Sequence, residues 1–214
     1  MNGIPKECRC GEKHQRTPFA FFRCYAKLCC KLAKLRSWKS LSRREGTIRR
    51  PNTGLYWVNQ FRDGNLAIMA APRSLERLDA AILTWKNDGI DCVVSLVENS
   101  EMPGLIEAEA ALCQEFGIAF QSFPIRDKSI PPSLEDFVGL VRRVADEISL
   151  GRAVAIHCRA GIGRSATLAA CVLIWLGVNA EVALDMIAEA RGIEVPETEA
   201  QRQWILKFSD VAPN

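Results

Sequence analysis

The sequence predicts an α/β fold, with a mostly parallel, twisted sheet of about five strands and helices on both faces. Three observations lead to this prediction. Short apolar runs of strand length alternate with longer segments whose apolar residues recur at helical spacing. One of the short runs, residues 153–156, is entirely apolar, as is typical of strands covered on both faces. The 214 residues also suffice for one α/β domain plus an extension.

The folded part is predicted to begin with a pair of strands, residues 55–58 and 66–70. Asp63-Gly64 stands between them and is a strong signal for a tight turn. The pair is therefore expected to resemble a hairpin.

Helices and strands alternate in the rest of the chain. Ser74 is a candidate N-cap for the first helix, and the segment 133–149 has a clear amphipathic pattern. The expected elements are a helix at 74–86, a strand at 91–97, a helix at 103–116, a strand at 118–125, a helix at 133–149, a strand at 153–156 and helices at 166–176, 180–191 and 197–208. This alternation implies a mostly parallel sheet.

Charge divides the chain into two parts. Residues 1–50 hold 14 Lys and Arg against 3 Asp and Glu, whereas residues 51–214 hold 14 against 22. We therefore predict a basic, Cys-rich extension over 1–50 and one folded domain over 51–214. Because the folded part is acidic overall, nucleic acid is not expected as its partner. No run of about 20 apolar residues is present, so no membrane span is predicted.

Three interpretations of the extension stay open. Apolar and basic residues mix at helical spacing over 19–35, so the stretch 19–44 could contact an anionic membrane as a peripheral helix. A metal site built from the cysteines and His14 is less favoured, because their spacing fits no regular pair of Cys-x2-Cys motifs. The third interpretation is a disordered segment without a catalytic role.

The strand at 153–156 leads into a tight loop and the start of a helix, His157-Cys158-Arg159-Ala160-Gly161-Ile162-Gly163-Arg164-Ser165. Such a loop turns its backbone N–H groups inward at the positive end of a helix dipole, which makes a cradle for phosphate. The residues expected to form the cradle are Arg159, Ala160, Gly161, Ile162, Gly163 and Arg164. Arg164 offers a planar pair of donors to two oxygens of a dianion. Cys158 lies at the bottom of this positive cradle, where a thiolate nucleophile is expected.

This string resembles the signature of the cysteine-based protein tyrosine and dual-specificity phosphatases: His, Cys, five residues, Arg and Ser. The resemblance covers roughly residues 55–210 and implies a protein tyrosine phosphatase-like fold. It implies hydrolysis of phosphotyrosine, and of phosphoserine and phosphothreonine, through a phosphocysteine intermediate. The partner would be a phosphorylated protein, with no cofactor and no metal. A thiolate nucleophile needs a reducing compartment, so we expect a cytoplasmic location, free or peripheral to a membrane.

Phosphoryl transfer to Cys158 needs an acid for the leaving group and later a base for water. Asp127 follows a predicted strand in a proline-bounded loop, 31 residues before Cys158. In a parallel sheet this separation places both at the same edge. The segment is similar to the general-acid loop of dual-specificity phosphatases, so Asp127 is predicted to serve as acid and base. Glu135 and Asp136 are weaker alternatives because they fall inside the next helix.

Other residues are predicted to support this chemistry. Ser165 can donate a hydrogen bond to the sulfur of Cys158 and stabilise the departing thiolate. His157 should point away from the pocket, and in the resembling family this His orders the loop by hydrogen bonding. Arg159 and Lys128 either enlarge the positive rim or are surface charges.

Two further polar residues are candidates. Gln201 matches a late Gln that many members of the resembling family carry, and a packing role is its alternative. Tyrosine-specific members have a water-positioning Gln four residues earlier, where this chain has Glu197, so a dedicated water-positioning Gln is in doubt. Glu98, which follows a strand, could pair with Arg164.

The sequence predicts the substrate less specifically than it predicts the catalytic residues. The chain lacks the Asn-Arg-Tyr segment that deepens the phosphotyrosine pocket in tyrosine-specific members, so it resembles the dual-specificity branch. The alternatives are a phosphatase of phosphoinositides or of RNA 5′-phosphates, and an inactive phosphate-binding module. Intact Cys158, Arg164 and Asp127 argue against the inactive module.

Overall fold

The computed structural model describes residues 54–60 and 64–213. The predictions for residues 1–50, among them the membrane-binding helix, lie outside these described residues. None of the helices in the described ranges is long and apolar enough to cross a membrane.

The core of the domain is a five-stranded sheet in the order β1-β2-β5-β3-β4. The strands are β1 (Tyr56–Gln60), β2 (Asn65–Ala70), β3 (Cys92–Ser95), β4 (Ala119–Ser122) and β5 (Ala153–Cys158). β1 pairs antiparallel with β2, and every other pair of neighbours is parallel. The predicted opening hairpin and the mostly parallel sheet are both confirmed.

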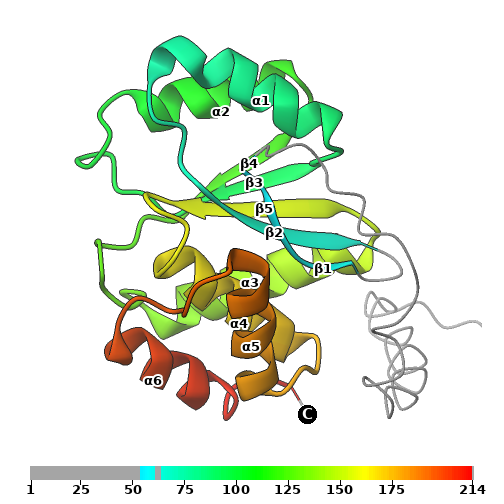
Figure 1. Cartoon of the computed structure of the whole chain (residues 1–214), viewed down its shortest axis with the longest axis vertical. Helices are drawn as coiled ribbons and strands as arrows, with labels where there is room; N and C mark the ends of the chain where they lie inside the picture. The colour runs from blue at the N-terminus through cyan, green and yellow to red at the C-terminus, as the bar shows by residue number, and fades with distance from the viewer. Residues whose placement is uncertain (1–53, 61–63, 214) are drawn as a thin grey trace, which may run out of the picture. The chain divides into compact units, whose positions relative to one another are not determined.

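Helices cover both faces of the sheet (Figure 1). One face carries α1 (Leu78–Asn87) and α2 (Leu105–Glu115); the other carries α3 (Leu134–Ser149), α4 (Arg164–Trp175), α5 (Ala180–Arg191) and α6 (Glu199–Phe208). Successive side chains of β5 point to opposite faces of the sheet and pack into the apolar cores on both sides. Val154, Ile156 and Cys158 join the core on the α3–α6 side, and Ala153 and Ala155 join the core on the α1–α2 side.

Helix starts differ most from the expectations. Leu75–Arg77 forms a separate 3₁₀ turn before α1, and Ser74 makes no side-chain capping hydrogen bond, so the predicted cap is wrong. α6 begins at Glu199 because Thr198 and Gln201 form a reciprocal capping box. Thr-x-x-Gln is readable in the sequence and would have placed this boundary.

The central strand β5 ends at the carboxyl edge of the sheet, and the loop that follows Cys158 begins there. Its last two residues are flanked on both sides, since Cys158 is in register with Ala70 of β2 and His157 with Ser95 of β3. The backbone of this end is fixed further by hydrogen bonds from Ala71 N to Cys158 O (2.8 Å) and from Leu96 N to His157 O (2.9 Å). The start of the loop after β5 is therefore held by backbone hydrogen bonds from both neighbouring segments.

Candidate active site

Cys158 is the last residue of β5, and its sulfur faces the first turn of α4. It is 3% exposed, and its Sγ lies 3.4 Å from the hydroxyl of Ser165. This is the distance at which a hydroxyl donates to a thiolate, so the geometry agrees with the predicted pairing. Arg164 and Ser165 themselves form the start of α4, which begins two residues earlier than expected.

The loop between Cys158 and α4 presents free donors. Within the described part of the chain, the backbone N–H groups of residues 159–163 donate no hydrogen bond to backbone or side chain. These residues connect Cys158 to the first turn of α4, which is the positive end of the helix dipole. Five amides without an internal acceptor at a helix start are what a phosphate dianion would need.

Two glycines allow the loop to fold this way. Gly161 has a φ of +71°, and a Cβ there would come within 2.5 Å of the carbonyl oxygen of Met69. A Cβ at Gly163 would come within 3.0 Å of both amide atoms of Gln201. The first glycine lets the loop pass over the end of β2, and the second lets it pack against α6.

The guanidinium of Arg164 is buried, and both of its terminal nitrogens donate hydrogen bonds. It is 2% exposed and donates from Nη1 to Glu101 (2.5 Å) and the Ile125 carbonyl (2.8 Å). From Nη2 it donates to the other oxygen of Glu101 (2.9 Å) and to Asp127 (2.8 Å). The planar fork expected to meet a phosphate thus meets a bidentate carboxylate, with Asp127 as a second acceptor.

Charge pairing shifts the pKa of both main partners. Burial alone would raise the pKa of Glu101, but the hydrogen bonds and charge of Arg164 outweigh it and hold that pKa below its usual range. Burial would likewise lower the pKa of Arg164, yet Glu101, the nearby charge of Cys158 and Asp127 raise it. Arg164 is therefore a permanent cation next to the sulfur.

The partner of Arg164 is Glu101, so the prediction for Glu98 is wrong. The chain turns directly after β3, with Glu101 N donating to the Glu98 carbonyl and Glu98 N donating to the Glu101 carboxylate. This turn brings the carboxylate of Glu101 back over the sheet edge. The sequence carries two similar acids here, and nothing in the local pattern distinguishes them.

Asp127 lies at the same sheet edge as Cys158, as predicted, with its side chain 42% exposed. The loop that carries it is held at three consecutive residues. Asp127 accepts from Arg164, Lys128 pairs with Glu197 (3.1 Å), and the Ser129 carbonyl accepts from Gln201 (3.1 Å). Lys128 adopts a φ of 58°, which residues other than glycine seldom occupy.

Two polar residues near the start of α6 contact the loop that carries Asp127, which we call the acid loop. Gln201 is completely buried and links the start of α6 to that loop, which agrees with the packing alternative. Glu197 takes the place of a water-positioning Gln and instead holds Lys128. Lys128 is therefore paired, whereas Arg159 and Ala160 form the exposed part of the phosphate loop.

Two charged residues beside the loop were missed by the sequence reasoning. Arg191, at the end of α5, donates to the Ala160 carbonyl (3.2 Å), with its guanidinium carbon 3.9 Å from the ring centroid of Tyr56. Glu109 of α2 lies 2.9 Å from His157, on the face of β5 opposite the sulfur. His157 points away from the pocket as predicted, but its ring makes no hydrogen bond to the loop.

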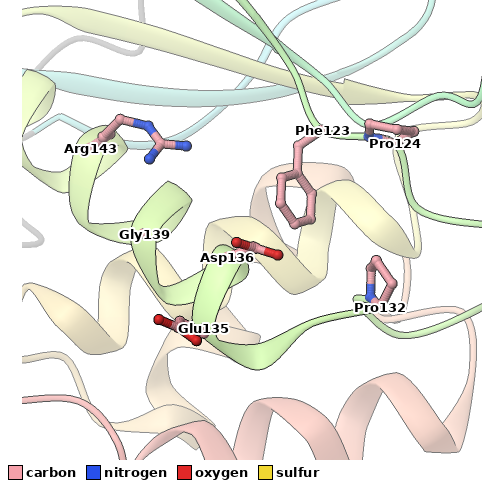
Figure 2. A pocket seen from close by; sticks show the side chains of 7 residues that line it. All are labelled: Phe123, Pro124, Pro132, Glu135, Asp136, Gly139 and Arg143. Atoms are coloured by element: carbon pink, nitrogen blue, oxygen red, sulfur yellow. The ribbon is translucent and has the colours of Figure 1, made fainter.

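A separate pocket of about 460 Å³ opens beside the acid loop and the start of α3 (Figure 2). Its lining residues are Phe123, Pro124, Pro132, Glu135, Asp136, Gly139 and Arg143. Glu135 and Asp136, the weaker alternatives for the acid, line this pocket and not the phosphate loop. The geometry therefore favours Asp127 as the group that meets the reacting phosphate.

Among the cysteines of the described residues, we expect Cys158 alone to react with iodoacetamide near pH 7. Burial raises the pKa of Cys92 to about 11, that of Cys113 to about 12, and that of Cys171 well above its ordinary value. These three thiols stay protonated, and a thiol is a poor nucleophile. Peptide mass spectrometry after limited labelling measures this, and inorganic phosphate should slow the labelling of Cys158. Faster labelling of Cys92, Cys113 or Cys171 would contradict it.

Comparisons with known proteins agree with this geometry. A family model described as "Polymorphic toxin system, DSP-PTPase phosphatase" matches residues 67–178. Rat cyclin-dependent kinase inhibitor 3 is 28% identical over 132 residues, which are 58% of this chain and 60% of that protein. Human protein tyrosine phosphatase type IVA 3 is 38% identical over 77 residues, 35% of this chain and 44% of that protein. The chain thus spans less than two thirds of these relatives.

The fold is similar to solved structures as well. A crystal structure of Tk-PTP in the active form superposes with a TM-score of 0.60 at 25% identity. The match covers 73% of this chain and 97% of that one.

Proposed function

Because the chain belongs to the DSP-PTPase phosphatase family, we propose that it hydrolyses phosphotyrosine, and phosphoserine or phosphothreonine, in protein substrates through a phosphocysteine intermediate. The observation that carries the proposal is the loop of free amides between Cys158 and α4. Five N–H donors and the α4 dipole would hold the three non-bridging oxygens of a phosphate monoester above the sulfur.

In the first step the thiolate of Cys158 attacks phosphorus. A phosphorus–sulfur bond forms and the phosphorus–oxygen bond to the substrate breaks, and the leaving oxygen takes a proton from Asp127. In the second step Asp127 removes a proton from water, whose oxygen binds phosphorus as the phosphorus–sulfur bond breaks. Ser165, 3.4 Å from the sulfur, donates to the thiolate that is regenerated.

Arg164 links phosphate binding to the acid. Its Nη2 donates to Asp127 at 2.8 Å, whereas the bidentate Glu101 holds the guanidinium plane. A substrate dianion that takes over Nη2 would release Asp127 toward the leaving oxygen. The acid would then become available only once a phosphate is in place.

A protein substrate is supported by the names of the relatives, which are protein tyrosine phosphatases and a cyclin-dependent kinase inhibitor. The chain also lacks the Asn-Arg-Tyr segment that deepens the phosphotyrosine pocket in tyrosine-specific members, and for this reason phosphoserine and phosphothreonine are included among the proposed substrates.

The test is a panel of substrates with the reduced, full-length chain. An aryl phosphate, a phosphotyrosine peptide, a phosphothreonine peptide and a phosphoinositide would be compared by kcat/KM. We expect turnover of the aryl phosphate and of both peptides. Hydrolysis of the phosphoinositide alone would replace the proposed substrate class, and no hydrolysis of any member would overturn the proposed activity.

A further inference from the structure

A buried pair of ionisable side chains lies behind the phosphate loop. His157 Nε2 and Glu109 Oε1 are 2.9 Å apart, and both side chains are 0% exposed. Within the described residues, neither carboxylate oxygen and neither ring nitrogen has a hydrogen-bond partner in good geometry. The contact at 2.9 Å is therefore the one close polar contact that these two side chains make within the described residues.

The surroundings of this pair are apolar. The α1–α2 side of the sheet packs Met69, Val93, Leu105, Cys113 and Ala155 into one cluster. His157 is in register with Met69 on one side and Ser95 on the other, and the Ser95 hydroxyl is itself buried without a partner in the described chain. Burying a carboxyl group and an imidazole at such a place costs desolvation free energy, so packing alone does not account for them.

The pair is attached directly to the nucleophile. His157 precedes Cys158, and its backbone carbonyl accepts from Leu96 at the end of β3. The side chains of His157 and Cys158 point to opposite faces of the sheet, so an anchor on His157 fixes the strand end without entering the pocket.

One segment of the chain thus reaches both sides of the loop. Glu101, before α2, pairs with Arg164 at the start of α4. Glu109, within α2, contacts His157 on the face of β5 opposite the sulfur. His157, which precedes Cys158, and Arg164, at the start of α4, each contact an acid from residues 101–109.

We propose that Glu109 is a positioning residue, whose buried carboxylate anchors the His157 ring and thereby fixes the strand end from which Cys158 attacks. This inference rests on the proposed function for its kinetic readout. It predicts that the carboxylate matters for the reactivity of Cys158 although it lies on the far side of the sheet.

The experiment uses the full-length chain with Glu109→Gln, Glu109→Asp, His157→Asn and the double variant Glu109→Gln/His157→Asn. Glu115→Gln, an exposed acid on the same helix, is the matched control. For each, kcat and KM on an aryl phosphate, the rate of Cys158 alkylation at one pH and the near-UV circular dichroism are measured.

For Glu109→Gln we expect kcat to fall on the order of 10-fold with little change in KM, and Cys158 alkylation to slow, because a small misplacement of the nucleophile weakens the reaction more than binding. Glu109→Asp should retain more activity than Glu109→Gln. The double variant should be no worse than His157→Asn, since both substitutions remove the same anchor. The control should behave as the wild type.

Three outcomes would overturn the proposal. One is a folded Glu109→Gln with wild-type kcat and alkylation rate. Another is an effect that adds in full to that of His157→Asn. The third is loss of folding in both Glu109 variants, which would assign the residue to stability. If the wild type itself had no turnover, the proposed function would fail, and the alkylation rates would still decide the role of Glu109.

Discussion

Replacing Cys158 by Ser should abolish turnover of an aryl phosphate, with a fall in kcat of ~10⁴-fold or more. The hydroxyl that replaces the thiol at the end of β5 would lie next to the hydroxyl of Ser165, which is not a base, and a serine hydroxyl is a much weaker acid than a thiol. It would therefore not be ionised at neutral pH and would not attack phosphorus. Steady-state kinetics with reduced protein measures the effect.

The same variant should still bind phosphate, since the loop amides and Arg164 remain. Inorganic phosphate is expected to raise the unfolding temperature of Cys158→Ser as it does that of the wild type. Cys171→Ser makes the same exchange at a buried thiol in α4, away from the loop, and should keep activity. Retained turnover in Cys158→Ser would remove Cys158 from the mechanism.

Replacing Asp127 by Asn should lower kcat on the order of 10²–10⁴-fold, the range for loss of a general acid. An amide keeps the size of the side chain but has no proton to give to the leaving oxygen. The loss should be smallest for phosphates of acidic phenols, because these leave without protonation. The measurement is kcat across a series of leaving groups.

Asp136→Asn is the matched control for this prediction. Asp136 is exposed, lies at the start of α3 and lines the pocket beside the acid loop. Its substitution should leave the series of leaving groups unchanged. A uniform loss in Asp127→Asn for all leaving groups would instead assign Asp127 to holding Arg164, with which it pairs at 2.8 Å.

The parts of the site that the sequence predicts are those encoded over short distances. The loop from Cys158 to Ser165 is one continuous string, and its strand and helix follow from apolar runs on either side. Asp127 follows from spacing, because one helix–strand unit in a parallel sheet returns the chain to the same edge. The α/β fold itself follows from alternation that persists along the whole domain.

The parts that the sequence does not predict depend on contacts between distant residues. Glu101 rather than Glu98 reaches Arg164 because of a turn that only the folded chain defines. Glu109 did leave a signal, since it stands between Leu105 and Cys113 on the buried stripe of α2, where a charge is out of place. Its partner His157, however, comes from a strand 48 residues away in the chain.

The most direct test of the account is to trap the phosphoenzyme. Asp127→Asn would be mixed with an activated aryl phosphate, denatured rapidly at neutral pH and digested for peptide mass spectrometry. Because this variant lacks the base for the second step, we expect one phosphoryl group to accumulate on the peptide containing Cys158, and none to appear when Cys158 is also replaced by Ser. Continued turnover with no phosphoryl group on that peptide, or with the group on another residue, would contradict the phosphocysteine mechanism.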